Sequence, residues 1–351
     1  MPMSAIRSVG DAIDATRAFM LPVSLRRWAT LALVVLFMGT PGTPVPANPQ
    51  FFDPVLWRGP SEAAGGEAAF EGGLDDLLQF ELFAPTTWPF WLLVAVTVVL
   101  VGWLLYQVVG VLMRFVLVEA LSRDAVRLRA DGRANLGNSV RVVAFRLGVG
   151  LLAAPIVLAL GSTVAPFGPV TVGGWAVGLV GVALAGVALF AWLLDAVTVQ
   201  FVVPVMVRTE SGVLASWRRF WPVLVGSWTE YVAFGLIRAA LGVAVGVAAA
   251  VGFAVALALG GVLVVTVGAI VVAAAGGLSG LGAVGLAVLA VLLLLFAAYA
   301  VVAYGVVTVP FQVYLWTYAL LVLGDTDDAL DLVPAFRAQA RAGDARLFAG
   351  D

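Results

Sequence analysis

Five polar or ionisable side chains interrupt segments that are otherwise apolar. Arg238 follows Trp228 by ten residues, about 15 Å along a helix, so we expect it near mid-membrane if Trp228 marks the membrane surface. An arginine at that depth costs about 2.5–3.5 kcal/mol to insert and needs a partner, for which Asp195 is the natural candidate. The predicted intramembrane polar site consists of Asp195, Gln200, Glu230, Tyr231 and Arg238.

Two interpretations of this polar site stay open. In the first, the residues bind an ion, a lipid headgroup or a small solute inside the helix bundle. In the second, Asp195 and Arg238 form a structural ion pair that holds two helices together. Arg114, Glu119 and Arg146 lie near expected membrane ends, where pairing or extension toward the headgroups explains them.

The residue types that are missing exclude much enzymatic chemistry. The chain has no cysteine and no histidine, which removes disulfides, thiol nucleophiles, Cys/His metal sites and the commonest general base. It also has no lysine, which removes Schiff-base chemistry and the lysine of a phosphate-binding P-loop. We therefore predict no catalytic residues, no metal, no cofactor and no nucleic-acid partner.

The elements that must position these residues are membrane-spanning helices. Apolar residues make up 62% of the chain and charged residues 11%, whereas a soluble domain is roughly half apolar and a quarter charged. Several apolar runs reach the length of about 18 residues that a transmembrane helix needs. The predicted fold is an all-α polytopic transmembrane helix bundle over 21–323.

The number of spans depends mainly on residues 228–275. A single helix of that length would be about 70 Å long, whereas the hydrocarbon core is about 30 Å thick. The segment is either one long helix with a tilted or re-entrant part, or two spans with a turn near Gly260-Gly261. We predict six spans, with eight as the alternative, arranged as three hairpin repeats over 21–118, 140–207 and 220–323.

The polar segments complete the predicted organisation. Residues 1–20 have the spacing of an amphipathic helix on the membrane surface. The apolar segment that follows Arg26-Arg27 is either a retained first span or a signal peptide cleaved near Val45-Pro46-Ala47, and we favour the retained span. Residues 40–87 form an acidic, proline-rich loop, and 324–351 form a charged tail.

The positions of the arginines predict the orientation of the chain. All of the 19 arginines except Arg58 and Arg238 fall in the N-terminal segment or in 114–146, 208–219 and 337–346. These segments alternate with arginine-free turns, and arginine-rich flanks stay in the cytoplasm. We therefore predict a multi-pass cell-membrane protein with both termini in the cytoplasm and the acidic loop outside.

One arginine- and tryptophan-rich segment has the composition of a helix in the membrane interface. Its rings would lie at the acyl boundary and its guanidinium groups on lipid phosphates. The predicted partners are accordingly membrane lipids, including anionic headgroups, together with a second copy of the chain or another membrane protein. The predicted lipid-facing residues are Trp217, Arg218, Arg219, Trp221 and Trp228.

Three parts of the sequence carry a family resemblance, and the surplus of acids over a lysine-free set of bases adds a halophilic character. Together they resemble a family of haloarchaeal multi-pass membrane proteins, more distantly similar to the membrane domain fused to bacterial glycerophosphodiester phosphodiesterases. The resemblance implies six helices and no known activity, and no catalytic residue is carried over. The matching parts are Asp11–Phe19 with Leu21-Pro22 and Arg27-Trp28; Val203–Met206 with Glu210, Gly212, Trp217, Phe220-Trp221, Trp228 and Glu230-Tyr231; and Tyr318–Asp327.

The sequence thus predicts an integral membrane protein without enzymatic activity. We expect a scaffold or an accessory in envelope or lipid organisation. The alternative is a small-solute or ion transporter, or a channel, with a polar site at Asp195 and Arg238. A third hypothesis, ranked below both, is a lipid-modifying enzyme that uses the carboxylates of this site.

Overall fold

The computed structural model describes residues 4–21, 24–38, 90–164, 174–277, 280–339 and 341. Throughout these ranges the regular structure is helical, and they contain no strand. The predicted acidic loop 40–87 and the candidate cleavage region near Ala47 lie outside them. The labelled elements are α1 (Ser4–Met20), α2 (Leu25–Met38), α6 (Phe90–Arg123), α7 (Leu128–Val164), α8 (Gly174–Val197), η2 (Thr198–Val202), α9 (Val203–Thr209), α10 (Val213–Gly226), α11 (Trp228–Ala274), α12 (Ala283–Thr326) and η4 (Asp328–Leu330).

Five of these helices, namely α6, α7, α8 with its continuation, α11 and α12, are long and apolar enough to cross a membrane. Apart from their charged segments in the head, these helices are apolar around their whole circumference, which is typical of a helix in a lipid environment. With this composition the protein is an integral membrane protein. The first predicted span, α2, has 14 residues and is about 21 Å long, so it falls short of the hydrocarbon core within the described residues.

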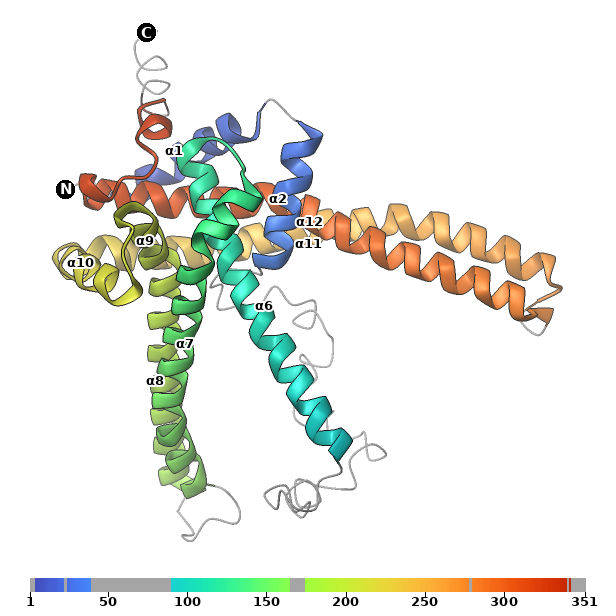
Figure 1. Ribbon diagram of the computed structural model, residues 1–351, viewed down its shortest axis with the longest axis horizontal. Helices are drawn as coiled ribbons and strands as arrows, with labels where there is room; N and C mark the ends of the chain where they lie inside the picture. The colour runs from blue at the N-terminus through green and yellow to red at the C-terminus, as the bar shows by residue number, and fades with distance from the viewer. Residues whose placement is uncertain are drawn as a thin grey trace.

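The helices form one head and three limbs (Figure 1). The head consists of α1, α2, η2, α9, α10, η4 and the adjoining ends of the long helices. The limbs are the outer part of α6, the α7–α8 hairpin and the α11–α12 hairpin. The α11–α12 hairpin leaves the head in a different direction from the other two limbs, and α6 diverges from α7–α8 with distance from the head.

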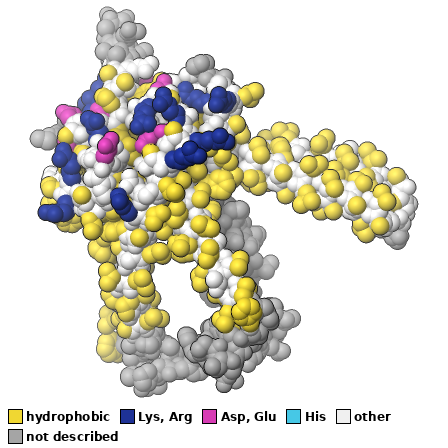
Figure 2. Space-filling view, viewed as in Figure 1, with side chains coloured by type: hydrophobic (Ala, Val, Ile, Leu, Met, Phe, Trp, Pro, Cys, Tyr) yellow, Lys and Arg dark blue, Asp and Glu magenta, His cyan; other side chains and the backbone are white. Residues whose placement is uncertain are grey.

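Charge is divided sharply between the head and the limbs. Figure 2 shows arginine and acidic side chains gathered on the head, whereas the visible surfaces of the limbs are apolar. The charge-free parts of the long helices are 90–113, 147–164, 174–194, 239–274 and 283–324. This division is what a water-facing head and lipid-facing limbs require.

The core of the head is built around α12, which contacts α1, α2, α11, η2 and η4. Trp316 and Tyr318 are among the largest fully buried side chains of the described residues. The helix α2 packs between α12 and α6, where glycines allow close approach. A Cβ at Gly305 would lie 3.2 Å from the Ala32 carbonyl oxygen, and one at Gly110 would lie 3.1 Å from that of Phe37.

Residues 228–275, the uncertain part of the span count, form one continuous helix. The helix α11 runs through Gly260-Gly261 without a turn, so the alternative with two spans there is wrong. Gly260 lies under the ring of Tyr299, whose hydroxyl donates to the Ala256 carbonyl at 2.7 Å. The glycine therefore makes room for a ring from α12 rather than ending the helix.

Two local features connect the limbs to the head. The arginine-rich stretch after Arg123 is mostly helical, because α7 begins at Leu128. Between α8 and α9 the chain widens into the π-helix η2, two residues before Pro204. A proline lacks an N–H donor and its ring displaces the carbonyl four residues earlier, which explains the wider turn at this point.

Candidate functional site

The five residues predicted as one polar site lie in three separate places. The predicted pair of Asp195 with Arg238 is wrong, because Asp195 pairs with Arg146 and Arg238 binds the backbone of α12. The prediction took α11 and α8 as neighbours, whereas α8 packs on α7 and α11 packs on α12. The contacts of Asp195 thus lie within the α7–α8 hairpin, and those of Arg238 lie between α11 and α12.

Arg238 lies in the core of the head, with 8% of its surface exposed. Its Nη1 donates to the Leu315 carbonyl at 3.1 Å, and its Cζ lies 6.0 Å from the centroid of the Phe234 ring. The Phe234 ring is in turn stacked on Tyr318, with the centroids 5.1 Å apart. The Nη2 of Arg238 has no hydrogen-bond partner among the described atoms, so this residue is a buried cation enclosed mainly by rings.

Glu230 and Tyr231, in the first turn of α11, form hydrogen bonds with α1 and with the end of α12. The Glu230 carboxylate accepts hydrogen bonds from the Ser4 hydroxyl at 2.8 Å and from the backbone N–H groups of Ser4 and Ala5. It thereby satisfies the N-terminus of α1, where negative charge is favourable. The Tyr231 hydroxyl lies 2.9 Å from that of Thr326 at the end of α12.

Gln200 is buried in the π-helix η2, and its Nε2 has no hydrogen-bond partner among the described residues. The neighbouring Phe201 joins a cluster of rings with Phe220 and Tyr231. These residues pack the junction of α8, α10 and α11 and do not bring Gln200 to Asp195. The predicted site is therefore not one constellation.

The pair that does form, Arg146 with Asp195, has a bidentate geometry. Nε of Arg146 donates to Oδ1 of Asp195 at 2.5 Å, and Nη2 donates to Oδ2 at 3.0 Å. The two side chains are 25% and 37% exposed, so the pair is accessible from one side. Arg146 lies in α7 and Asp195 in α8, and the pair closes the base of their hairpin where it joins the head.

The exposed side of this pair faces a crevice between α6 and the α7–α8 hairpin, with a volume of about 480 Å³. Apart from the ion pair, its polar lining consists of Gln107 and Thr198. The remaining lining is apolar. The lining residues are Trp103, Gln107, Val143, Phe145, Arg146, Leu147, Val149, Gly150, Leu151, Ala154, Ala191, Leu194, Asp195 and Thr198.

A second arginine, Arg114, lies behind the crevice on α6. It follows Gln107 by two helical turns on the same face and lies within electrostatic range of both Arg146 and Asp195. Its Nη2 donates to the Met38 carbonyl at 3.1 Å, while its Nε is buried without a partner. Among the described residues Arg114 forms no ion pair, so one further guanidinium group lies near the Arg146–Asp195 pair without lining the crevice.

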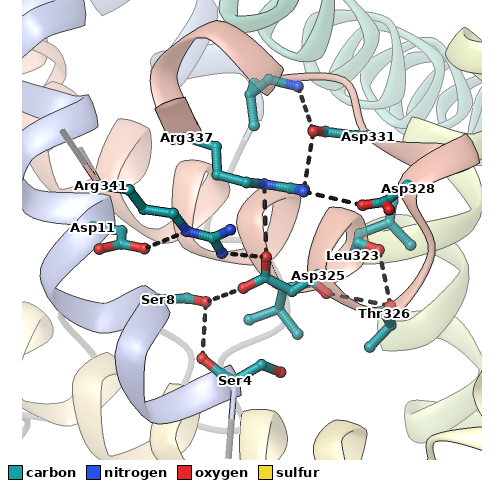
Figure 3. Close-up of polar contacts among 12 residues, drawn as sticks. Ser4, Ser8, Asp11, Leu323, Asp325, Thr326, Asp328, Asp331, Arg337 and Arg341 are labelled. Carbon is teal, nitrogen blue, oxygen red and sulfur yellow. Dashed lines mark hydrogen bonds and ion pairs between the residues drawn. The ribbon is translucent and has the colours of Figure 1, made fainter. Parts of the chain in front are cut away.

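The head also contains a buried network of acids and arginines that was not predicted (Figure 3). Arg337 lies 3.6 Å from Asp325 and 3.0 Å from Asp331, and Arg341 lies 2.6 Å from Asp325. Ser8 of α1 donates to the second oxygen of Asp325 at 3.1 Å. The network folds part of the predicted tail onto the head, and the spacing of the acids by three and the arginines by four was its signal in the sequence.

The five residues predicted to face lipid lie on or next to α10. Arg218, Arg219, Trp221 and Trp228 are exposed, with Trp221 at 57% and Trp228 at 61%. Trp217 is half-buried instead, and its indole N–H donates to the Thr198 hydroxyl at 3.2 Å. Trp217 thus connects α10 to the edge of the crevice.

Comparison with known proteins gives one match. Residues 3–333 match the model of a Family of unknown function (DUF7544). No curated protein and no solved structure matches the chain.

Proposed function

The chain belongs to this family of unknown function, and we propose that it is a non-enzymatic membrane scaffold that organises lipid around its limbs. The observation that carries the proposal is the division of charge between head and limbs. The limb residues of five long helices have no charged side chain, and the limbs diverge from one another instead of packing into one bundle. Apolar surfaces held apart in this way are covered by lipid in a membrane.

The same division supports six spans with both termini on the head side. The helix α1 lies in the head, whereas α6 begins at the end of its limb, so the chain crosses to the far side between Met20 and Phe90. The helix α2 starts that crossing. Because the head carries most of the arginines, the positive-inside rule places it in the cytoplasm.

Retention of α2 is part of this proposal. Its residues Leu31, Val34, Val35 and Met38 are buried against the rest of the head, and the Met38 carbonyl accepts from Arg114. Cleavage as a signal peptide would expose this surface. The haloarchaeal origin and the distant similarity to the phosphodiesterase-associated domain stay predictions from the sequence.

The orientation is tested with single cysteines, because the chain has none of its own. Arg219→Cys lies on the exposed side of α10 in the head, and Val284→Cys lies at the far turn of α11–α12, where Val284 is 79% exposed. In intact cells a membrane-impermeant maleimide should label Val284→Cys and reach Arg219→Cys only after lysis. Labelling of both from outside would overturn the orientation.

The scaffold itself is tested in proteoliposomes of the full chain with spin-labelled lipids. A lipid-organising scaffold should hold a motionally restricted lipid population in proportion to protein and pass no small ions. The absence of a restricted population would overturn the proposal. A matched set of protein-free vesicles provides the baseline for both measurements.

One observation favours a transporter as the second candidate, namely the accessible Arg146–Asp195 pair at the edge of apolar limbs. Charged residues inside spans often mark ion or substrate paths. An ion flux that disappears in Asp195→Asn, while that variant keeps its unfolding temperature, would replace the scaffold with a transporter.

A further inference from the structure

We infer that the crevice between α6 and α7–α8 binds one lipid with an anionic phosphate headgroup, with the headgroup at Arg146 and the tails between the limbs. This inference rests on the proposed lipid-organising function and names the lipid and its site. It is carried by charge, donor geometry and shape, each of which is independent of the others.

The charge at the closed end of the crevice favours an anion. The charges of Arg146 and Asp195, which line the crevice, offset each other, and Arg114, which lies behind the crevice within electrostatic range of both, leaves one positive charge in excess. In an apolar surrounding such an excess is costly unless a counter-charge binds. A phosphodiester supplies one negative charge and several acceptor oxygens.

Hydrogen-bond donors at this end are still free. Arg146 uses Nε and Nη2 for Asp195, so its Nη1 is not engaged by that pair. Gln107, which also lines the crevice, carries an amide N–H donor. Guanidinium groups bind phosphate oxygens well because their N–H groups match the spacing of these acceptors.

The shape of the crevice fits a lipid rather than a free phosphate ion. From Arg146 the wall of α7 continues through Leu147, Leu151 and Ala154, an apolar stretch of about 12 Å along the helix. Trp103 and Leu194 line the opposite sides, and the volume of about 480 Å³ lies in the range of ligand sites. Because α6 and α7–α8 diverge away from the head, tails would extend between the limbs (Figure 1).

The orientation of such a lipid agrees with the orientation of the protein. Arg146 and Asp195 stand next to the charge-free parts of α7 and α8, which begin at 147 and end at 194, so we place the pair at the level of the headgroups on the side of the head. A lipid of the head-side leaflet would place its phosphate at the pair and its tails in the crevice without inverting. A phosphatidylcholine of equal chain length adds a positive choline near Arg146 and should bind less well.

The test measures lipids bound to the full chain by native mass spectrometry from a neutral detergent. The probes are phosphatidylglycerol and phosphatidylcholine with the same acyl chains. The wild type should retain phosphatidylglycerol over phosphatidylcholine by about tenfold, because both lipids offer the phosphodiester but only phosphatidylcholine adds a positive charge at a site with excess positive charge. Equal retention of the two lipids would overturn the inference.

Two variants of the ion pair separate a binding site from a structural contact. Asp195→Asn releases Arg146 and removes a negative charge, so retention of phosphatidylglycerol should rise. Arg146→Gln removes a donor and leaves Asp195 charged, so retention should fall. A purely structural pair predicts the same direction for both variants, and that result would overturn the inference.

Two further variants control for surface charge and for the tails. Arg141→Gln removes an exposed arginine from the same helix, where Arg141 binds only Asn138, and should leave retention unchanged. Ala154→Trp fills the apolar part of the crevice without changing charge, and it should lower retention of phosphatidylglycerol. If Ala154→Trp leaves the retention of phosphatidylglycerol unchanged, the crevice does not hold the acyl chains, and the proposed lipid site is wrong.

The outcome is separable from that of the proposed function. Loss of the preference for phosphatidylglycerol, with a restricted lipid population still present in proteoliposomes, would remove this site and keep the scaffold. Loss of the restricted population as well would remove both.

Discussion

The two hairpins α7–α8 and α11–α12 are held together in different ways. The α7–α8 hairpin is tied at its base by the bidentate Arg146–Asp195 pair, and it leaves a crevice open on the side of α6. The α11–α12 hairpin is interlocked along its length, where Tyr299 lies on Gly260 and Phe253 meets the Tyr304 ring edge to face. At its base Arg238 binds a backbone carbonyl and rings.

The α7–α8 hairpin leaves space beside its ion pair in which a ligand could bind, whereas the α11–α12 hairpin is closely packed. Ring-on-glycine packing brings α11 and α12 into close contact at these positions. An accessible ion pair beside a third helix offers charge, donors and space together. The candidate function therefore belongs to the α7–α8 side of the molecule, and the α11–α12 hairpin extends the limb surface.

The largest loss of stability is expected from Arg337→Gln, which removes a cation at the base of α12. Removing the cation leaves Asp331 without its closest cation and takes from Asp325 one of its two arginines, and both carboxylates are nearly buried. Loss of one member of a buried ion network costs about 3–5 kcal/mol, so the unfolding temperature in detergent should fall strongly. Arg341→Gln, at a residue whose side chain is 44% exposed, should have the smaller effect. Equal shifts for the two variants would contradict the network as described.

Gly260→Leu should have the next largest effect, because the new side chain meets the Tyr299 ring. Overpacking at a tight contact costs about 1–3 kcal/mol and should separate α11 from α12. The matched control is Gly261→Leu, whose side chain points into open space. Thermal unfolding, followed by tryptophan fluorescence, measures the stability of both variants. Equal losses of stability would show that the contact between Gly260 and the Tyr299 ring does not hold α11 against α12.

A double-mutant cycle on Arg146 and Asp195 should give a smaller effect. Each single change, Arg146→Gln or Asp195→Asn, should cost about 1–2 kcal/mol in neutral detergent, because it leaves a charged partner unpaired. The double variant should cost less than the sum, with a coupling energy of about 1 kcal/mol. Additive costs would show that the pair does not tie α7 to α8.

The smallest effect is expected from Arg238→Met. Arg238 has one hydrogen bond to a carbonyl and an unpartnered Nη2, so its burial is poorly compensated. An apolar residue of similar volume should keep stability within about 1 kcal/mol of the wild type. Arg238→Ala leaves a cavity and should cost more, about 2–3 kcal/mol. If both variants lose equally, the charge of Arg238 is essential to the head.

The long helices were predictable from the sequence because uniform hydrophobicity over many residues is a strong signal in itself. Membrane placement followed from the same runs, and the structure has five helices that meet the requirements of a span. The glycine pattern gave one wrong alternative, because Gly260-Gly261 suggested a turn where α11 continues. A glycine pattern does not distinguish a chain break from the close passage of a ring such as that of Tyr299.

The site was less predictable because pairing depends on which helices are neighbours. Depth along a helix suggested Arg238 for Asp195, but the first turns of α11 belong to the head, so Trp228 does not set the depth of Arg238 as assumed. Arg146 was available in the sequence as a partner and was assigned to the membrane interface. The packing of α7 on α8 decided between them.

The most direct test of the account measures the depth of spin labels on single cysteines in proteoliposomes of the full chain. Labels at Val182 of α8 and Val265 of α11, both about 70% exposed, should be accessible to oxygen and shielded from a water-soluble nickel complex. Labels at Arg133 and Arg219 in the head should show the reverse. Nickel accessibility at both limb positions would contradict a charged head with lipid-covered limbs.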